Sequence, residues 1–137
     1  MEAPLIIDIL EDSCLSVAAD SMLCDAIHLM HENKQSCVMI TENNKPIGII
    51  TESDAVGLLA ESFQGVNWDN LQVGHLMTSP VIAASLDLNI LEAIIIAHGG
   101  NIRHIPVTDE KGNLLGVANQ TQLVKALVAF CRSGDLW

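Results

Sequence analysis

The sequence predicts an α+β fold made of two tandem β-α-β-β-α units, packed sheet to sheet into one module with pseudo-twofold symmetry. The main observation is an internal repeat, because Ser16–Leu59 and Pro80–Leu127 follow the same order of elements. Ala26 and Ala93 occupy matching places in the two copies, 67 positions apart. A half-buried sheet needs a partner, so two such copies are expected to pack face to face. A cleft between two related halves is a natural place for a ligand.

The first repeat is predicted to begin with a short strand, followed by a helix that Asp20 or Ser21 caps and that runs to about His31. Two strands follow, joined by a turn rich in Asn and Pro, so they are expected to pair antiparallel. A second helix completes the unit, and both helices cover one face of the sheet. The remaining elements are strands at 16–18, 37–41 and 47–50 and a helix from 52 to about 63.

The second repeat is predicted to contain the same elements. Its first helix has Asn89 as the capping residue, with Glu92 three residues further on. Short helical turns are expected before each repeat, at Ile6–Leu10 and Val73–Met77. The elements of this repeat are strands at 81–83, 104–108 and 114–118 and helices at 90–98 and 120–131.

These elements predict four segments along the chain. Residues 1–63 form the first unit together with its N-terminal lead-in, and residues 64–79 form a linker. Residues 80–132 form the second unit, and residues 133–137 form a tail.

Composition excludes several classes of function. The chain has a net charge of −11 and only six Lys or Arg among 137 residues, so a phosphate backbone is repelled and nucleic acid is not expected as a partner. No apolar run approaches the length of about 18–20 residues that a membrane-spanning helix needs. Half of the residues are nonetheless hydrophobic, with a mean hydropathy of +0.37. We interpret the surplus as a partner surface, most simply that of a homodimer.

The four cysteines predict a reducing compartment. Cys14, Cys24, Cys37 and Cys131 form no C-x-x-C pair, and no His lies at zinc-site spacing from two of them. The N-terminus lacks the basic region of a secretory signal. Buried, reduced thiols in a cytoplasmic protein without a metal site are therefore expected.

The sharpest local signal is the string Gly48-Ile49-Ile50-Thr51-Glu52-Ser53-Asp54. One interpretation is a capping box, in which Thr51 caps a helix and Asp54 bonds back. The other is a binding site: the hydroxyls of Thr51 and Ser53 and the free N–H groups of a helix start favour a phosphate, and the Asp54 carboxylate accepts from both hydroxyls of a ribose.

The second copy of this string supports the capping interpretation. It contains Asn119 and Gln122 at the positions of Thr51 and Asp54, so the cap is retained while the carboxylate is lost. From residue chemistry alone, capping explains both copies.

Together these features resemble a tandem pair of CBS domains, named for cystathionine β-synthase and called a Bateman module. The resemblance covers roughly Ile7 to Phe130. It rests on the repeat, the string at Gly48–Asp54, Val73–Thr78 before the second unit, and Arg103-His104-Ile105-Pro106-Val107. The resemblance implies a dimeric module without catalytic activity that binds AMP, ADP, ATP or S-adenosylmethionine in a cleft between its units.

The resemblance also implies the roles of individual residues. Asp54 would hold the ribose, and Thr51 and Ser53 would contact phosphate or ribose. The strand around Val38 would offer backbone groups to the adenine, with Ala18 near the base. Arg103 and His104 would reach the phosphates from the other unit. Because Asn119 and Gln122 depart from the family pattern, we expect at most one good site per chain.

The sequence thus predicts a regulatory module that binds an adenosine-containing ligand and signals to an effector protein or fused domain. The alternative is a ligand-free module for dimerisation or protein interaction. An enzyme is not expected, because no nucleophile lies beside a base and no glycine-rich phosphate loop or metal triad is present. No cofactor is expected beyond the regulatory ligand.

Overall fold

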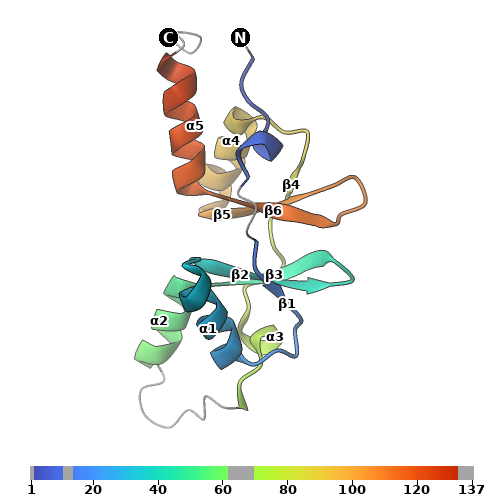
Figure 1. Cartoon of the computed structure of the whole chain (residues 1–137), viewed down its shortest axis with the longest axis vertical. Coiled ribbons are helices and arrows are strands. Elements are labelled where there is room, and N and C mark those ends of the chain that lie inside the picture. The colour runs from blue at the N-terminus through green and yellow to red at the C-terminus, as the bar shows by residue number, and fades with distance from the viewer. Residues whose placement is uncertain (1, 11–13, 62–69, 133–137) are drawn as a thin grey trace. The chain divides into compact units, whose positions relative to one another are not determined.

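The computed structural model describes residues 2–10, 14–61 and 70–132, in which the chain forms two separate compact units (Figure 1). The first-repeat unit is Cys14–Val81. The second-repeat unit combines Met1–Ser13 with Ile82–Trp137. The predicted tail 133–137 and the first part of the predicted linker lie outside the described residues. None of the described helices is both long and apolar enough to cross a bilayer.

The first-repeat unit is a three-stranded sheet with helices on one face (Figure 1). The strand order is β1-β2-β3, with β1 parallel and β3 antiparallel to β2. The turn between β2 and β3 uses Asn43 and Asn44, both at positive φ, as their turn-forming chemistry predicts. The elements are β1 (Ser16–Val17), α1 (Leu23–Asn33), β2 (Cys37–Glu42), β3 (Lys45–Thr51), α2 (Glu52–Glu61) and α3 (Val73–Leu76).

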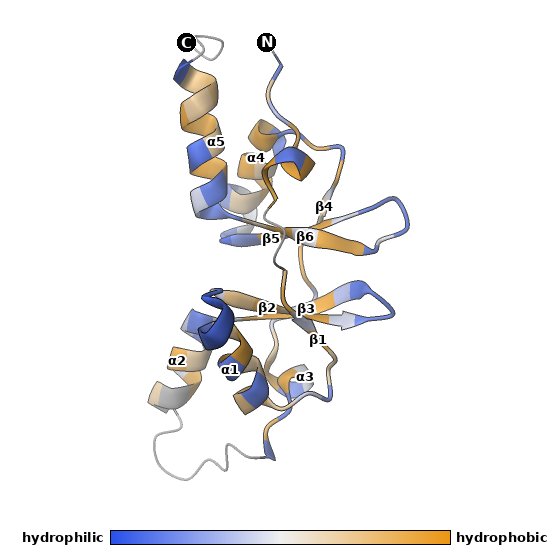
Figure 2. Ribbon diagram, viewed as in Figure 1, coloured by the Kyte–Doolittle hydropathy of each residue, from blue (hydrophilic) through white to orange (hydrophobic). Residues whose placement is uncertain are grey.

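The second-repeat unit has the same topology, with strand order β4-β5-β6. The polar turns of the two units, between β2 and β3 and between β5 and β6, stand out as hydrophilic in Figure 2. A short 3₁₀ helix, η1, joins this unit from the start of the chain. The elements are η1 (Ile6–Ile9), β4 (Ala84–Ser85), α4 (Ile90–Gly100), β5 (His104–Thr108), β6 (Leu114–Asn119) and α5 (Gln120–Arg132).

Each unit has its own hydrophobic core between its sheet and its helices. In the first-repeat unit the fully buried residues include Leu23 of α1 and Ile40 and Ile50 of the sheet. In the second-repeat unit the corresponding residues are Ile90, Val107 and Ala118. This confirms the predicted fold class of two β-α-β-β-α units, because matching residues of the repeat fill matching cores.

The two lead segments exchange places between the repeats. Residues 4–10 precede the first repeat, yet Ile6 is fully buried in the core of the second-repeat unit. The backbone N–H of Ile6 donates to the carbonyl of Leu88 at 2.7 Å, and that of Ile90 donates to Pro4 at 2.9 Å. The lead-in therefore belongs to the second-repeat unit. This differs from the expectation that residues 1–63 form the first unit together with the lead-in.

The segment before the second repeat repeats this arrangement in the first-repeat unit. Val73, 67 positions after Ile6, is fully buried there, and its N–H donates to the carbonyl of Ser21 at 2.9 Å. The N–H of Leu23 donates to Leu71 at 2.8 Å. These bonds match those of Ile6 and Ile90 one for one, so each lead segment completes the unit that does not follow it.

The predicted cap of α1 is wrong. The N-cap residue is Met22, without a side-chain hydrogen bond, rather than Asp20 or Ser21. The first amide of α1, that of Leu23, donates to the carbonyl of Leu71 in the lead segment. In α4 the predicted capping box of Asn89 and Glu92 is confirmed.

The first strand of the second repeat also differs from its prediction. It is Ala84–Ser85 rather than Val81–Ala83. Ala84 pairs with Val107 and is almost fully buried, whereas Ile82 remains 45% exposed. The strand thus begins where its side chains enter the core, and not where the sequence is most apolar.

Candidate functional site

The junction between β3 and α2 positions Thr51 and Asp54. Thr51 is the last residue of β3 and pairs with Cys37 of β2, and Glu52 starts α2 without an intervening loop. The N–H of Glu52 donates to the carbonyl of Ser36 at 2.9 Å. The helix start is therefore fixed to the sheet on both sides.

Thr51 and Asp54 form the predicted capping box. The N–H of Thr51 donates to Asp54 Oδ2 at 2.9 Å, and the N–H of Asp54 donates to Thr51 Oγ1 at 3.1 Å. These bonds satisfy two backbone donors of the strand-to-helix junction. The box uses one carboxylate oxygen of Asp54, so its other oxygen, Oδ1, lies outside the box in a fixed orientation.

The charges at the start of α2 favour a hydroxyl over a phosphate. Both Glu52 and Asp54 lie in the first turn, where the helix dipole stabilises negative charge. A phosphate at the same place would meet two carboxylates. Ser53 is exposed, and its hydroxyl can donate or accept. The chemistry of this turn therefore suits a neutral diol or a cation.

Val38 lies beside this junction, but its side chain and its backbone groups are already used in the core and the sheet. Its side chain is fully buried in the core, and Val38 pairs with Ile50 of β3. The N–H of Met39 donates toward β1, to Leu15, at 2.9 Å. Because backbone groups alternate along a strand, the N–H and carbonyl of Val38 face β3. At this end of β2, the groups that point away from β3 belong to Cys37.

Ala18 is not brought together with these residues. It is exposed and follows β1, whose parallel register aligns Val17 with Ile40. Ala18 is therefore level with Thr41, about three residues or roughly 10 Å along the sheet from Val38. Its carbonyl accepts from the N–H of Ser21 at 3.0 Å in a turn.

Arg103 and His104 lie in the second-repeat unit, at the start of β5. Arg103 is exposed, and its carbonyl accepts from the N–H of Gln120 at 2.9 Å. His104 is half-buried and pairs with Asn119. This junction between β6 and α5 matches the one between β3 and α2 in the other unit.

The second capping box is formed by neutral residues. The N–H of Asn119 donates to Gln122 Oε1 at 2.7 Å, and the N–H of Gln122 donates to Asn119 Oδ1 at 2.8 Å. The cap is thus retained without a carboxylate, as the sequence predicts. With Arg103 next to it, this junction is less negative than the junction at Thr51.

Two cavities are described on the second-repeat unit, and neither is lined by any of the seven predicted site residues. Among the described residues, no cluster of three or more His, Cys, Asp or Glu side chains has the arrangement of a metal site.

None of the four cysteines forms a disulfide, and their accessibility differs. Cys24 is exposed, so the prediction of a buried thiol is wrong there. Burial, with a smaller contribution from nearby Cys14, raises the pKa of Cys37 to about 12. Burial also raises the pKa of Cys14. Cys14 lies two residues before Ser16 and Cys37 two residues before Met39, and Ser16 and Met39 are partners in the parallel β1–β2 pair, so the two cysteines are level with each other. The sequence held no signal for this proximity, which depends on that register.

A family model for the CBS domain matches residues 6–61 and 73–129. The chain therefore belongs to the CBS domain family, as a tandem pair. An uncharacterized protein of Methanopyrus kandleri is 33% identical over 66% of this chain and 45% of its own length. An uncharacterized protein of Methanocaldococcus jannaschii is 29% identical over 93% of each chain. The chain thus spans less than half of the Methanopyrus relative, and one fifth of a 30% identical CBS domain-containing protein of Arabidopsis thaliana.

Solved structures share the fold at low identity. A CBS domain pair in complex with 5′-methylthioadenosine and S-adenosyl-L-methionine has a TM-score of 0.81 and 21% identity, over 94% of this chain and 99% of that one. A CBSX2 structure in complex with AMP has a TM-score of 0.78 and 22% identity, with the same coverage. A putative signal-transduction protein with CBS domains from Burkholderia ambifaria has a TM-score of 0.79 and 24% identity, covering 91% and 94%.

Proposed function

We propose that this chain is a non-catalytic regulatory module of the cytoplasm that binds an adenosine-containing ligand of the AMP, ADP, ATP or S-adenosylmethionine type. The observation that supports it most directly is the capping box, which orients the Asp54 carboxylate at the first turn of α2. Solved structures of this fold include complexes with AMP, 5′-methylthioadenosine and S-adenosyl-L-methionine, which is consistent with the proposal.

The proposed contacts follow the chemistry of each residue. Asp54 Oδ1 accepts from the ribose hydroxyls, and the hydroxyls of Thr51 and Ser53 bond to the same sugar. The backbone of β2 next to Val38, at Cys37, bonds to the base. Ala18 is the weakest member, because the register separates it from Val38.

We propose that Arg103 and His104 contribute to ligand affinity by contacting an anionic group of the ligand, such as a carboxylate. The two carboxylates at the start of α2 favour a ligand of low negative charge, so we place S-adenosylmethionine and AMP before ATP. The chain acts as a homodimer, and the ligand shifts the population of its conformations, which an effector protein or fused domain detects.

Ligand-induced stabilisation tests the proposal. The probes are AMP, ADP, ATP with and without magnesium, S-adenosylmethionine and 5′-methylthioadenosine. At 100 times its dissociation constant a ligand adds about 2.7 kcal/mol to the free energy of unfolding. We expect at least one probe to raise Tm, and Arg103→Ala to weaken its binding.

The second repeat supplies a matched control variant. Asp54→Gln gives the first box the same partner that Gln122 provides in the second, so the cap is retained while the carboxylate is lost. We expect Asp54→Gln to abolish the ligand shift with little change in the Tm of the unliganded protein. Glu42→Gln, which changes an exposed carboxylate at the last residue of β2, should leave the shift intact. Normal binding by Asp54→Gln would contradict the proposed site.

The second candidate function is a ligand-free module for dimerisation or protein interaction. It is favoured by exposed apolar side chains on the helices, such as Val56 at 67% and Ile95 at 71% exposure. If no probe changes Tm, this candidate replaces the first, and Thr51 and Asp54 act only as a helix cap.

A further inference from the structure

Two half-buried cysteines are level with each other at one end of the first-repeat sheet. Cys37 is the first residue of β2, and Cys14 lies just before β1, the strand that pairs parallel to β2. The register aligns Ser16 with Met39, and each cysteine lies two residues before one of these partners. The N–H of Met39 donates to the carbonyl of Leu15 at 2.9 Å, so the pairing of the two strands extends to the residue next to Cys14.

The two thiols lie on the same face of the sheet. Leu15 and Val38, which follow the two cysteines, pack in the core of the first-repeat unit. Side chains alternate between the faces of a strand, so Cys14 and Cys37 both point to the face opposite that core. Neighbouring strands lie about 4.8 Å apart, within the Cα separation of roughly 4.4–6.8 Å that a disulfide spans. Besides burial, the nearby Cys14 raises the pKa of Cys37, which independently indicates that the two groups are close.

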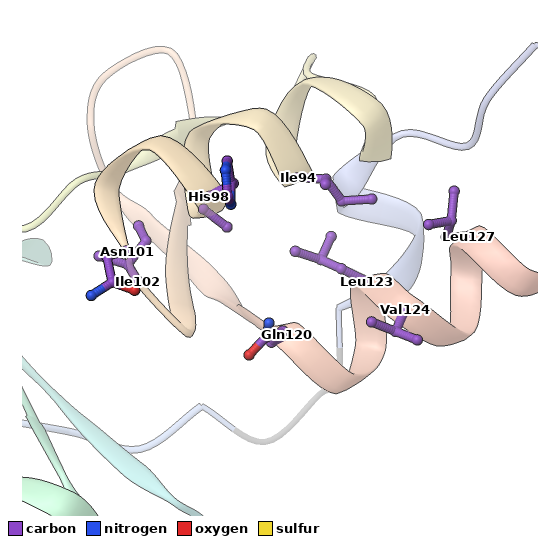
Figure 3. Close-up of a pocket in the computed structure, with 9 residues that line it drawn as sticks. Ile94, His98, Asn101, Ile102, Gln120, Leu123, Val124 and Leu127 are labelled. Carbon is purple, nitrogen blue, oxygen red and sulfur yellow. The ribbon is translucent and has the colours of Figure 1, made fainter.

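The other two cysteines lie on helices. Cys24 is exposed on α1. Cys131 of α5 lines a cavity of about 450 Å³, which shares Leu127 with a cavity of about 370 Å³ between α4 and α5. No cysteine lines this latter cavity (Figure 3). Of the four cysteines, all of which the structure describes, Cys14 and Cys37 are therefore the pair that strand pairing aligns.

We propose that Cys14 and Cys37 are a modification site, at which oxidation forms a reversible disulfide that weakens ligand binding. The formation of the disulfide stands on the strand register and the shared face. Its effect on binding rests on the proposed function, in which the backbone of Cys37 bonds to the base of the ligand. Disulfides of cytoplasmic proteins are typically transient and serve to sense oxidation.

The backbone of Cys37 connects the disulfide to the ligand site. Its N–H and carbonyl point away from β3, toward the side of β2 on which Cys14 lies. A disulfide would hold Cys14 against this side and cover the groups that the base needs. The capping box of Thr51 and Asp54 uses no cysteine atom, so the contacts to the ribose would remain. Oxidation therefore lowers the affinity without removing the whole site.

The oxidant is a low-molecular-weight disulfide such as glutathione disulfide. The Cys14 thiolate attacks one sulfur of the oxidant, the S–S bond of the oxidant breaks, and one thiolate leaves. The Cys37 thiolate then attacks the Cys14 sulfur of this mixed disulfide, and the second thiolate leaves. The two leaving groups take up the two protons that the cysteines release. Two electrons thus pass from the protein thiols to the oxidant, which is reduced to two thiols.

The raised pKa values make the exchange slow in both directions. Burial raises the pKa of Cys14 and of Cys37, so few of these thiols are thiolates at neutral pH and the attack on the oxidant is slow. A thiol of high pKa is also a poor leaving group, so the reduction of the disulfide is slow. The pair therefore responds to sustained oxidation rather than to a brief exposure.

Peptide mapping tests whether the disulfide forms. The variant with Cys24→Ser and Cys131→Ser keeps only the proposed pair, and it is incubated with glutathione disulfide until its thiol content is constant. We expect both thiols to be lost, the mass of the chain to fall by two hydrogen atoms, and a non-reducing digest to contain the peptides of Cys14 and Cys37 linked together. The two cysteines are 23 positions apart, so closing this loop should raise Tm by about 10 °C, and dithiothreitol should reverse the rise.

Two results would overturn the disulfide. One is glutathione bound to a single cysteine without a linked peptide, and the other is a disulfide between two chains. The same digest is made of the oxidised wild type, so the test holds even where the two serine substitutions impair folding. In the matched control Cys14→Ser, the oxidant should leave Tm unchanged.

Isothermal titration with AMP and S-adenosylmethionine tests the effect on binding. We expect the dissociation constant of the oxidised protein to be about tenfold higher than that of the reduced protein, as the loss of a hydrogen bond or two implies. Cys14→Ser should bind equally before and after treatment with the oxidant. Equal affinity of the oxidised and reduced wild type would overturn the control of binding. If neither probe binds the reduced protein, the proposed function fails, while the linked peptide still decides whether the disulfide forms.

Discussion

The exchange of lead segments makes a direct prediction about Ile6. This side chain is fully buried in the second-repeat unit, although it lies ten residues before the first strand of the first repeat. Ile6→Ala removes three carbon atoms from that core. Such substitutions cost about 2–5 kcal/mol, depending on how far the surroundings close over the cavity. For a chain of this length we expect a fall in Tm of roughly 10 °C.

The location of the effect tests the exchange itself. Hydrogen exchange should show weaker protection in β5, β6 and α5 of Ile6→Ala, whereas β2 and β3 keep theirs. Val73→Ala is the matched variant, because Val73 holds the equivalent place in the first-repeat unit. Its loss of protection should fall on β2 and β3. Leu5→Ala, at a residue 40% exposed, should cost much less than Ile6→Ala.

Either of two results would refute this reasoning. One is a loss of protection in Ile6→Ala that is confined to residues 16–61. The other is a cost below about 0.5 kcal/mol, which is typical of a surface substitution.

Two further predictions concern a close contact and a thiol. Gly48→Ala should lower the free energy of unfolding in urea by about 1–3 kcal/mol, because a Cβ there would overlap the Met77 side chain. Adding Met77→Ala to the same chain should recover part of this loss. Strict additivity of the two changes in unfolding free energy would contradict the contact. Cys37 should react with iodoacetamide far more slowly than Cys24 at pH 8, since its pKa is about 12. Folding raises the pKa of the Cys37 thiol, so the stabilising contribution of the protonated thiol is present below pH 9 and is lost as the pH rises toward 12. The Tm of Cys37→Ala should therefore fall less steeply at alkaline pH than that of the wild type. Equal reactivity of the two thiols would show that Cys37 is more accessible than the structure indicates.

The capping geometry at the candidate site was predictable because its chemistry is local. Thr51 and Asp54 are three residues apart, so a capping box follows from their types and spacing, and the same holds for Asn119 and Gln122. Val38 and Ala18 were less predictable. Which backbone groups of a strand remain available depends on its neighbours, and the parallel register of β1 and β2 is not written in either strand alone.

The sequence by itself determined the two units and their elements. The 67-residue repeat reveals the two copies. The apolar patterns and the turn residues that define the elements each act over a few neighbouring positions, so they can be followed along the chain. The tertiary structure decided which lead segment completes which unit. Pro4 and Leu71 offer carbonyls at equivalent positions of the two lead segments. Leu23 and Ile90 offer the first amides of equivalent helices. Because the repeats present equivalent partners, local chemistry favours either pairing equally, and only the packing of the whole chain selects the exchanged one.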